Sequence, residues 1–312
     1  LDTVGYIPAA GLHVDFCHSD KSTRAKNVQT AFSPRIGTSF TVGAMINIGM
    51  STSCVYPLSV EEGFRYSWLA GFDGVEVMVT NDKRTQNARD LRELSERFEQ
   101  PILSIHAPVL LLTHFVWGRD PQIKLERSAE LAAEVGASTV VVHPPFRWQS
   151  TYADEFLDIV RRTQLQTGVN IAVENMFPWK VRNRSMDMYS PGPDPRELDC
   201  DAVTLDFSHA ALSGHDALEL AHAFGERLKH VHLCDGSGPD DQARVFDEHL
   251  LPGEGGQPVA EVLNHLRDIS WDGHIVAEVN TRKAKTPVER LALLTQTLEF
   301  ARMHTTAELA VA

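Results

Sequence analysis

Short apolar runs rich in β-branched residues alternate with longer segments of helical periodicity from about residue 46 onward. This alternation is typical of βαβ units, in which helices join parallel strands. The runs predict eight strands, near residues 46–55, 74–78, 102–107, 138–143, 170–175, 203–207, 229–234 and 274–279. We therefore predict a single α/β domain, a (β/α)8 TIM barrel, for which a chain of 312 residues is an ordinary length.

Residues typical of helix ends mark several boundaries between the predicted elements. Ser59 with Glu62, and Thr286 with Glu289, have the spacing of capping boxes, and Pro287 would occupy the first helical position of the second. Three glycines stand where predicted helices should stop: Gly71, Gly136 and Gly168.

Two segments depart from the alternating pattern, and the first is residues 1–44, which show weak periodicity. The chain begins with Leu, and Met45 stands directly before the first predicted strand. We hypothesise that residues 1–44 form a peripheral extension upstream of the natural start. The barrel is then expected at 45–305, followed by a short tail at 306–312.

The second exception is the loop after the fifth predicted strand, from Phe177 to about Pro195. Long loops at the C-terminal side of a barrel often carry function. Four of its residues are expected to bind the substrate: Trp179, Lys180, Arg182 and Arg184. Basic side chains of this kind would orient an anionic group.

Composition narrows the possible partners and the compartment. The formal net charge is −13, which repels a polyanion and argues against a nucleic-acid partner. No apolar run of about 18 residues exists, so no membrane span is predicted. The N-terminus shows no basic region followed by an apolar stretch, so no signal peptide is expected. The cysteines have no CxxC spacing, which favours reduced thiols in a cytoplasmic protein: Cys17, Cys54, Cys200 and Cys234.

Histidines and acidic residues recur at the ends of the predicted strands, where barrel enzymes place their catalytic groups. Six consecutive strands present one such residue: His106, His143, Glu174, Asp206, His232 and Glu278. Three more follow in the adjoining segments: His209, Asp247 and His249. Because alternate residues of a strand face the same side, these nine side chains are expected to meet at one mouth.

Each of the nine could alone be a helix cap or an ion-pair partner. Together, four carboxylates in a medium of low dielectric would repel one another strongly, and cations would compensate them. Imidazole and carboxylate ligands suit zinc, manganese or iron, and zinc is the expected metal. Nine ligands exceed the three or four of a single catalytic ion, so two or three ions are expected. We interpret His230 as structural, and Glu76 has no evident partner.

The order of these residues resembles the xylose isomerase-like TIM barrel superfamily (AP endonuclease family 2) over roughly 46–300. Within it, SIHAP, VENM, LDFSHA, HLCD and DEHLLPGEGG resemble segments of endonuclease IV, which has a trinuclear zinc site. The resemblance implies that the nine residues are metal ligands, with Glu174 and Glu278 nearest the reacting atoms and therefore catalytic. It implies hydrolysis of a phosphoester by metal-activated water. A small phosphorylated substrate fits the acidic chain better than DNA.

The same superfamily includes sugar isomerases and epimerases, whose one-metal site resembles Glu174, Asp206, His232 and Glu278. A sugar or sugar-phosphate isomerase or epimerase is therefore the second hypothesis, with a carboxylate moving a proton between carbons. The supporting glutamate and arginine of tagatose and psicose epimerases are missing, and Asp247 and His249 are present. The DNA-binding loops of endonuclease IV are not recognisable either. A third hypothesis is a metal-bound ligand-binding protein without turnover.

Overall fold

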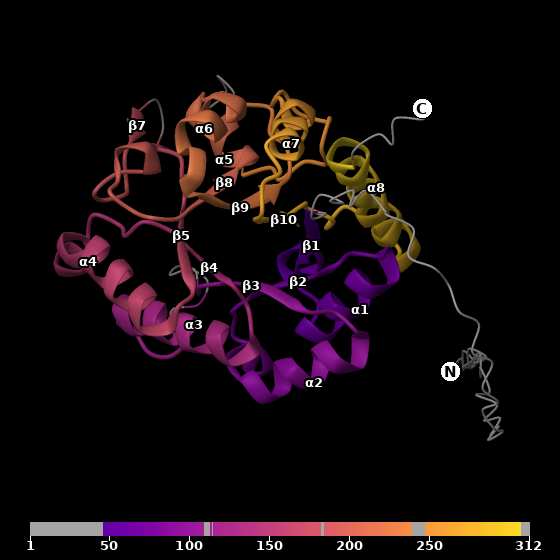
Figure 1. Cartoon of the computed structure of the whole chain (residues 1–312), viewed down its shortest axis with the longest axis horizontal. Helices are drawn as coiled ribbons and strands as arrows, with labels where there is room; N and C mark the ends of the chain where they lie inside the picture. Colours follow the sequence, from indigo (N-terminus) through magenta and orange to yellow (C-terminus); the bar gives the residue numbers. More distant parts are fainter. Residues whose placement is uncertain (1–45, 109–112, 114, 182–183, 239–246, 307–312) are drawn as a thin grey trace, which may run out of the picture. The chain divides into compact units, whose positions relative to one another are not determined.

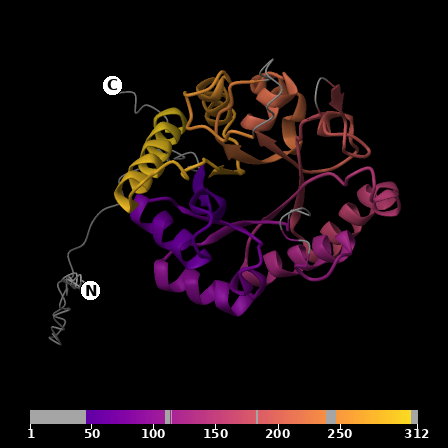
Figure 2. The same ribbon diagram turned by 180° about the vertical axis from the view of Figure 1, so that it is seen from behind.

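The computed structural model describes residues 46–108, 113, 115–181, 184–238 and 247–306. Its eight parallel strands close into a barrel in the order β1-β10-β9-β8-β5-β4-β3-β2, and helices surround them (Figure 1). The same ring is seen from behind in Figure 2. The predicted (β/α)8 TIM barrel is confirmed. The predicted extension at 1–44 and all but the first residue of the predicted tail lie outside the described residues.

Seven barrel strands lie within two residues of their predicted bounds, and only the first differs more. The strands are β1 (Asn47–Ser51), β2 (Gly74–Met78), β3 (Ile102–His106), β4 (Thr139–Val142), β5 (Asn170–Glu174), β8 (Val203–Asp206), β9 (Leu228–Leu233) and β10 (His274–Ala277). The predicted first strand was too long, because a 3-10 helix, η1 (Thr52–Val55), replaces its last residues. Ser51 Oγ accepts a hydrogen bond from Ser53 N and so begins this turn.

The helices follow the strands in alternation. They are α1 (Val60–Ala70), α2 (Ala88–Phe98), α3 (Pro121–Val135), α4 (Ser150–Thr167), α5 (Phe207–Ser213), α6 (Ala217–Phe224), α7 (Val259–Asp268) and α8 (Pro287–Thr305). Both predicted N-caps are confirmed, because Ser59 Oγ accepts from Glu62 N and Thr286 Oγ1 accepts from Glu289 N. The three predicted glycine caps have a left-handed backbone and end α1, α3 and α4: Gly71, Gly136 and Gly168.

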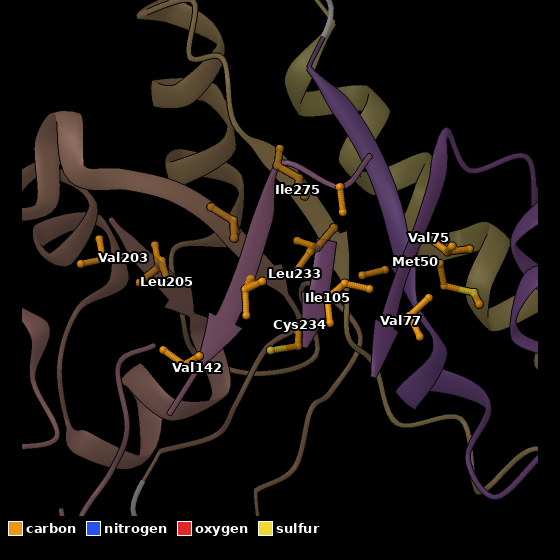
Figure 3. Packing of buried hydrophobic residues seen from close by; sticks show 14 of the residues in the cluster. Met50, Val75, Val77, Ile105, Val142, Val203, Leu205, Leu233, Cys234 and Ile275 are labelled. Atoms are coloured by element: carbon orange, nitrogen blue, oxygen red, sulfur yellow. The ribbon is translucent and has the colours of Figure 1, made fainter. Parts of the chain in front are cut away.

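The apolar core lies between the barrel strands and the helices (Figure 3). Alternate residues of each strand face it, such as Val75 and Val77 on β2 and Val203 and Leu205 on β8. The intervening residues face the barrel interior, and many are polar and fully buried: Ser51, Glu76, Ser104, Thr204, Asp206, His230 and His232. TIM barrels commonly fill this space with branched apolar side chains. The interior of this barrel is instead available for polar chemistry.

The segment after β5 contains a short antiparallel hairpin, β6 (Trp179–Val181) and β7 (Arg184–Met186). Beyond the hairpin, Tyr189 forms an antiparallel bridge with Phe146 of the β4–α4 connection. The remaining short elements are 3-10 helices: η2 (Lys83–Gln86), η3 (Pro195–Glu197) and η4 (Gly225–Arg227). In the part of the chain that the structure describes, no helix has the length and apolarity to cross a membrane.

Candidate metal centre

All nine predicted ligand residues lie at the C-terminal end of the barrel. His106, Glu174 and Asp206 end β3, β5 and β8, while His232 is the penultimate residue of β9. The others follow strands: His143 after β4, His209 on α5, Asp247 and His249 after β9, and Glu278 after β10. The juxtaposition expected from the sequence is therefore present, and the role of these residues as ligands stays a prediction.

The centre of the cluster is the four-residue site, which consists of Glu174, Asp206, His232 and Glu278. One ligand atom from each residue lies within 4.8 Å of the others, and all four residues are buried. His232 Nδ1 is 3.0 Å from Glu174 Oε1 and 2.9 Å from Glu278 Oε2. Asp206 Oδ2 is 3.7 Å from the same nitrogen. Three carboxylates and one imidazole thus surround one point.

Two further groups flank the four-residue site. The first consists of His106, His143 and Glu174, and the second of Asp206, His209 and His249. Asp247 joins the second group, because its Oδ2 lies 3.0 Å from His209 Nε2 and 2.9 Å from His249 Nε2. Glu174 and Asp206 each belong to two groups, as carboxylates that bridge neighbouring ions do. The geometry can therefore accommodate one to three cations.

The donor set and its hydrogen bonding fit a divalent cation. Glu174 Oε2 is buried and has no hydrogen-bond partner among the described residues, although His143 Nε2 is only 3.0 Å away. A buried carboxylate oxygen without a donor is costly unless a cation or proton approaches it. His249 Nδ1 lies 2.7 Å from the Glu278 carbonyl oxygen, an arrangement that leaves Nε2 directed at Asp247 as an available ligand atom.

The electrostatics of the cluster are dominated by burial and by the facing opposite charges. Burial opposes ionisation of Glu174, but the imidazoles of His232 and His143 reverse the shift and hold its pKa well below the usual value. Burial is also the largest effect on Asp206, and there it raises the pKa. Burial disfavours a charged His232, but Glu278 and Glu76 outweigh it and raise the pKa well above 6.5. The site therefore favours positive charge at its centre, which a metal ion can supply in place of protons.

Glu76 has partners, and the sequence-based expectation about it was wrong. Its Oε2 lies 3.0 Å from His230 Nε2 and accepts a hydrogen bond of 2.8 Å from Ser104 Oγ. Its Oε1 lies 3.3 Å from His232 Nε2, on the ring edge opposite the four-residue site. A metal-ligating histidine commonly donates its other ring N–H to a carboxylate, which fixes the tautomer. Glu76 is thus placed to orient His232 through an ion-pair contact, and its inward-facing position in the middle of β2 was the available signal.

The loop that carries Asp247 and His249 is organised by the buried Asp235. The Asp235 carboxylate accepts hydrogen bonds from four backbone N–H groups, those of Gly236, Gly253, Gly255 and Gln257, at 2.8 to 3.1 Å. A Cβ at Gly255 would lie 2.4 Å from Asp235 Oδ1, so only glycine permits this approach. The run PGEGG therefore lets the backbone fold closely around the Asp235 carboxylate.

Three of the four predicted substrate-binding residues belong to the β6–β7 hairpin. Trp179 packs edge-on against Phe146 and Trp148, with ring centroids 5.7 and 6.4 Å apart. Lys180 and Arg184 belong to the two hairpin strands, and Arg182 lies outside the described residues. Their contact with a substrate remains a prediction.

A cavity of about 600 Å³ opens beside the metal centre. Asp247, His249 and Glu278 line its inner part, and its walls are formed by the segments after β1, β2 and β10 together with Thr113 after β3. Most of the described lining follows β1 and its two neighbours in the barrel order, β2 and β10, whereas the hairpin follows β5, which stands opposite β1. Ser53 in this wall was not predicted from the sequence, and its Oγ donates a 2.9 Å hydrogen bond to Glu278 Oε1.

The contact between Glu76 and His232 predicts an effect on metal affinity. We expect Glu76→Gln to weaken divalent-metal binding by about ten- to a hundredfold, because the amide no longer holds the Nε2 proton of His232 by charge. Competition with a chromogenic chelator measures this affinity. The unfolding midpoint in excess chelator serves as the control for a folding defect. An unchanged affinity would show that Glu76 does not position the ligand.

The role of Asp235 predicts a local loss of order. Asp235→Asn should lower the free energy of unfolding by about 1–3 kcal/mol, because an amide NH2 would then face backbone N–H groups. Hydrogen exchange should become faster at Gly253 and Gly255 than in the barrel strands. Asp199→Asn, a change at an exposed surface carboxylate, is the matched control. Equal exchange in both variants would contradict this role.

Comparison with known proteins agrees with this architecture. The family model described as "Xylose isomerase-like TIM barrel" matches residues 69–303. An uncharacterized protein of Mycobacterium tuberculosis is 43% identical over 278 residues, which is 83% of this chain and 98% of that protein. Fructoselysine 3-epimerase of Escherichia coli O157:H7 is 19% identical over 264 residues, covering 77% of this chain and 92% of that enzyme.

Solved structures share the fold. A D-tagatose 3-epimerase-like protein has a TM-score of 0.59 and 25% identity, with 84% of this chain and 100% of that chain covered. The IOLI protein with a bound zinc atom has a TM-score of 0.61 and 15% identity, with the same coverage. These neighbours are an epimerase-like protein and a zinc-binding barrel, rather than the endonuclease IV that the motifs resemble. The match over residues 69–303 shows that the chain belongs to the xylose isomerase-like TIM barrel family.

Proposed function

We propose that this protein is a metal-dependent sugar isomerase or epimerase. The observation that carries the proposal is the buried four-residue site, whose Glu278 also lines the adjoining cavity. A cavity of about 600 Å³ has the size of a small-molecule pocket. The epimerases among the similar proteins support a sugar substrate over a phosphoester. They favour the second hypothesis drawn from the sequence over the first.

In the proposed reaction, Glu174 and Glu278 would transfer the proton to and from the sugar carbon. Glu174 belongs to β5 and Glu278 follows β10, and in the barrel order β8 and β9 lie between these strands. The two carboxylates therefore reach the site from separate sides, with Asp206 and His232 between them. Epimerisation takes a proton from one face of a carbon and returns one to the other face. One carboxylate would accept this proton and the other would donate.

The surroundings of the two glutamates support this role. Ser53 Oγ donates a hydrogen bond to Glu278 Oε1 and so limits the rotation of that carboxylate. Glu174 is 1% exposed and Glu278 is 6% exposed, so water has little access to either group. A divalent cation held by the four-residue site would polarise the carbonyl and the neighbouring hydroxyl of the sugar. Zinc is the expected ion, and manganese or iron also suits these ligands.

A second candidate function is phosphoester hydrolysis, and the two flanking groups favour it. A one-metal isomerase has no need of His106, His143, His209, Asp247 and His249 as ligands. If these groups held two further zinc ions, the formal charge of three ions and four carboxylates would be about +2, which would attract a phosphate. The two functions therefore differ in the number of ions per chain.

Metal content and proton exchange test the main proposal together. We expect elemental mass spectrometry to find one divalent ion per purified chain. In D2O, we expect the protein to exchange deuterium into a ketose at the carbon next to its carbonyl group. Glu174→Gln should slow this exchange by about 10²- to 10⁴-fold, because it removes a proton carrier. Circular dichroism and metal content control for folding. Exchange at the parental rate in this variant would exclude Glu174 as a carrier.

Replacement of Asp247 separates the two candidate functions. Under the one-metal proposal, Asp247→Asn should change proton exchange by less than about fivefold, since Asp247 is outside the four-residue site. Under the hydrolase alternative, the same variant should lose an ion and most of its activity on a chromogenic phosphodiester. A protein with three ions, and with hydrolysis that collapses in Asp247→Asn, would overturn the isomerase proposal.

A further inference from the structure

The cavity beside the metal centre has ends of different chemical character. Its inner part is lined by Asp247, His249 and Glu278, which belong to the metal centre. Its outer part includes Tyr56 and Arg282, both of which are exposed. Tyr56 follows η1, and Arg282 lies in the loop between β10 and α8. A molecule in this cavity would therefore contact the metal centre at one end and these two residues at the other.

Arg282 is the one permanent cation among the described residues that line the cavity. Its guanidinium carbon lies 5.0 Å from the centre of the Tyr56 ring, a cation–π contact. No carboxylate in the described part of the chain lies within 4.0 Å of it. Its backbone N–H donates to Asn280 Oδ1, which fixes the loop that presents it. The guanidinium is thus held by an aromatic face, and its N–H donors are available to a ligand.

Asp82, another acidic residue of the cavity wall, is already hydrogen-bonded to the backbone. Asp82 also lines the cavity, and its two oxygens accept hydrogen bonds from Val60 N and Arg84 N. The Glu278 carboxylate faces His232 and Ser53 at the inner end. The carboxylates in the described wall therefore have partners other than Arg282, and its charge is left for a ligand.

The spacing of the two ends suits a small phosphorylated or carboxylated sugar. Glu278 and Arg282 are four residues apart, so their Cα atoms lie within about 14 Å of each other. A sugar of five or six carbons with a terminal anionic group can span this distance together with the two side chains. Guanidinium groups bind such oxyanions through two parallel hydrogen bonds.

We propose that Arg282, held on the Tyr56 ring, binds a terminal oxyanion of the sugar substrate and so makes the protein selective for anionic sugars. The inference rests on the proposed sugar chemistry and specifies its substrate class. It also moves anion recognition from the hairpin, where the sequence predicted it, to the opposite side of the barrel mouth. A phosphate ester and a carboxylate present the same chemistry to Arg282.

Calorimetric titration of the metal-loaded protein tests this assignment. The probes are D-fructose, D-fructose 6-phosphate and D-fructuronate, which share a carbon chain and differ at its terminal group. We expect at least one anionic sugar to bind ten or more times tighter than D-fructose. Arg282→Gln should remove about ten- to a hundredfold of this affinity and leave D-fructose binding unchanged. Preference for the phosphate ester or for the acid identifies the source of the oxyanion.

The adjacent Lys283 provides the matched control. It is exposed and carries the same charge, but it is not among the described lining residues of the cavity, so Lys283→Gln should retain the preference. Tyr56→Phe should also retain it, because the ring remains, whereas Tyr56→Leu should weaken anionic binding about two- to fivefold. No preference for an anionic sugar, or an equal loss in the Lys283 and Arg282 variants, would overturn the proposal.

Binding affinity and proton exchange are separate measurements, so the two proposals can fail separately. A selectivity that Arg282→Gln abolishes, in a protein that exchanges no proton with any ketose, would refute the isomerase proposal alone. Rapid proton exchange into neutral ketoses, with no selectivity for anionic ones, would refute the role of Arg282 alone.

Discussion

The burial of several carboxylates at one end of the barrel is the constraint on which the rest of this structure depends. Removing an ionised carboxylate from water costs several kcal/mol unless opposite charge or hydrogen bonds compensate it. Here Glu174, Asp206 and Glu278 share the Nδ1 atom of His232 as a neighbour, at 3.0, 3.7 and 2.9 Å respectively. Such a cluster is stable only with added positive charge, either as protons on the histidines or as bound metal. Metal binding and folding of this region are therefore expected to be coupled.

Because side chains alternate along each barrel strand, one set forms the apolar core and the other set faces the interior below the candidate site. Outward-facing side chains such as Val75 and Leu205 pack against the helices and form the apolar core. Many inward-facing side chains are polar and stack in layers below the mouth, although Val141, Ala172 and Val276 are apolar. Glu76 and His230 form one such layer, directly beneath His232. Because Glu76 and His230 are fully buried and cannot move into water, this layer can hold the side chain of His232 above it in place.

The candidate ligand set is compatible with more than one type of reaction. The residues that line the surrounding cavity favour one of them. The four-residue site alone suits the movement of a proton on a sugar, whereas the flanking histidines and Asp247 could hold further ions. The cavity favours a small molecule, since most of its described wall consists of short segments after β1, β2 and β10. Within this family, the same barrel mouth can thus serve different substrates through changes in the loops around it.

The sequence was sufficient to predict the barrel, seven of its strands to within two residues and the meeting of nine acidic and imidazole side chains, because periodicity and strand ends are local properties. It did not reveal that Glu76 on β2 contacts His232 on β9, since these strands are not neighbours and the contact crosses the closed interior. The sequence also did not predict the 3-10 helix η1 or the contact of Arg282 with the Tyr56 ring. Contacts across a barrel depend on how strands far apart in the chain are brought together at closure, and only the tertiary structure decides this.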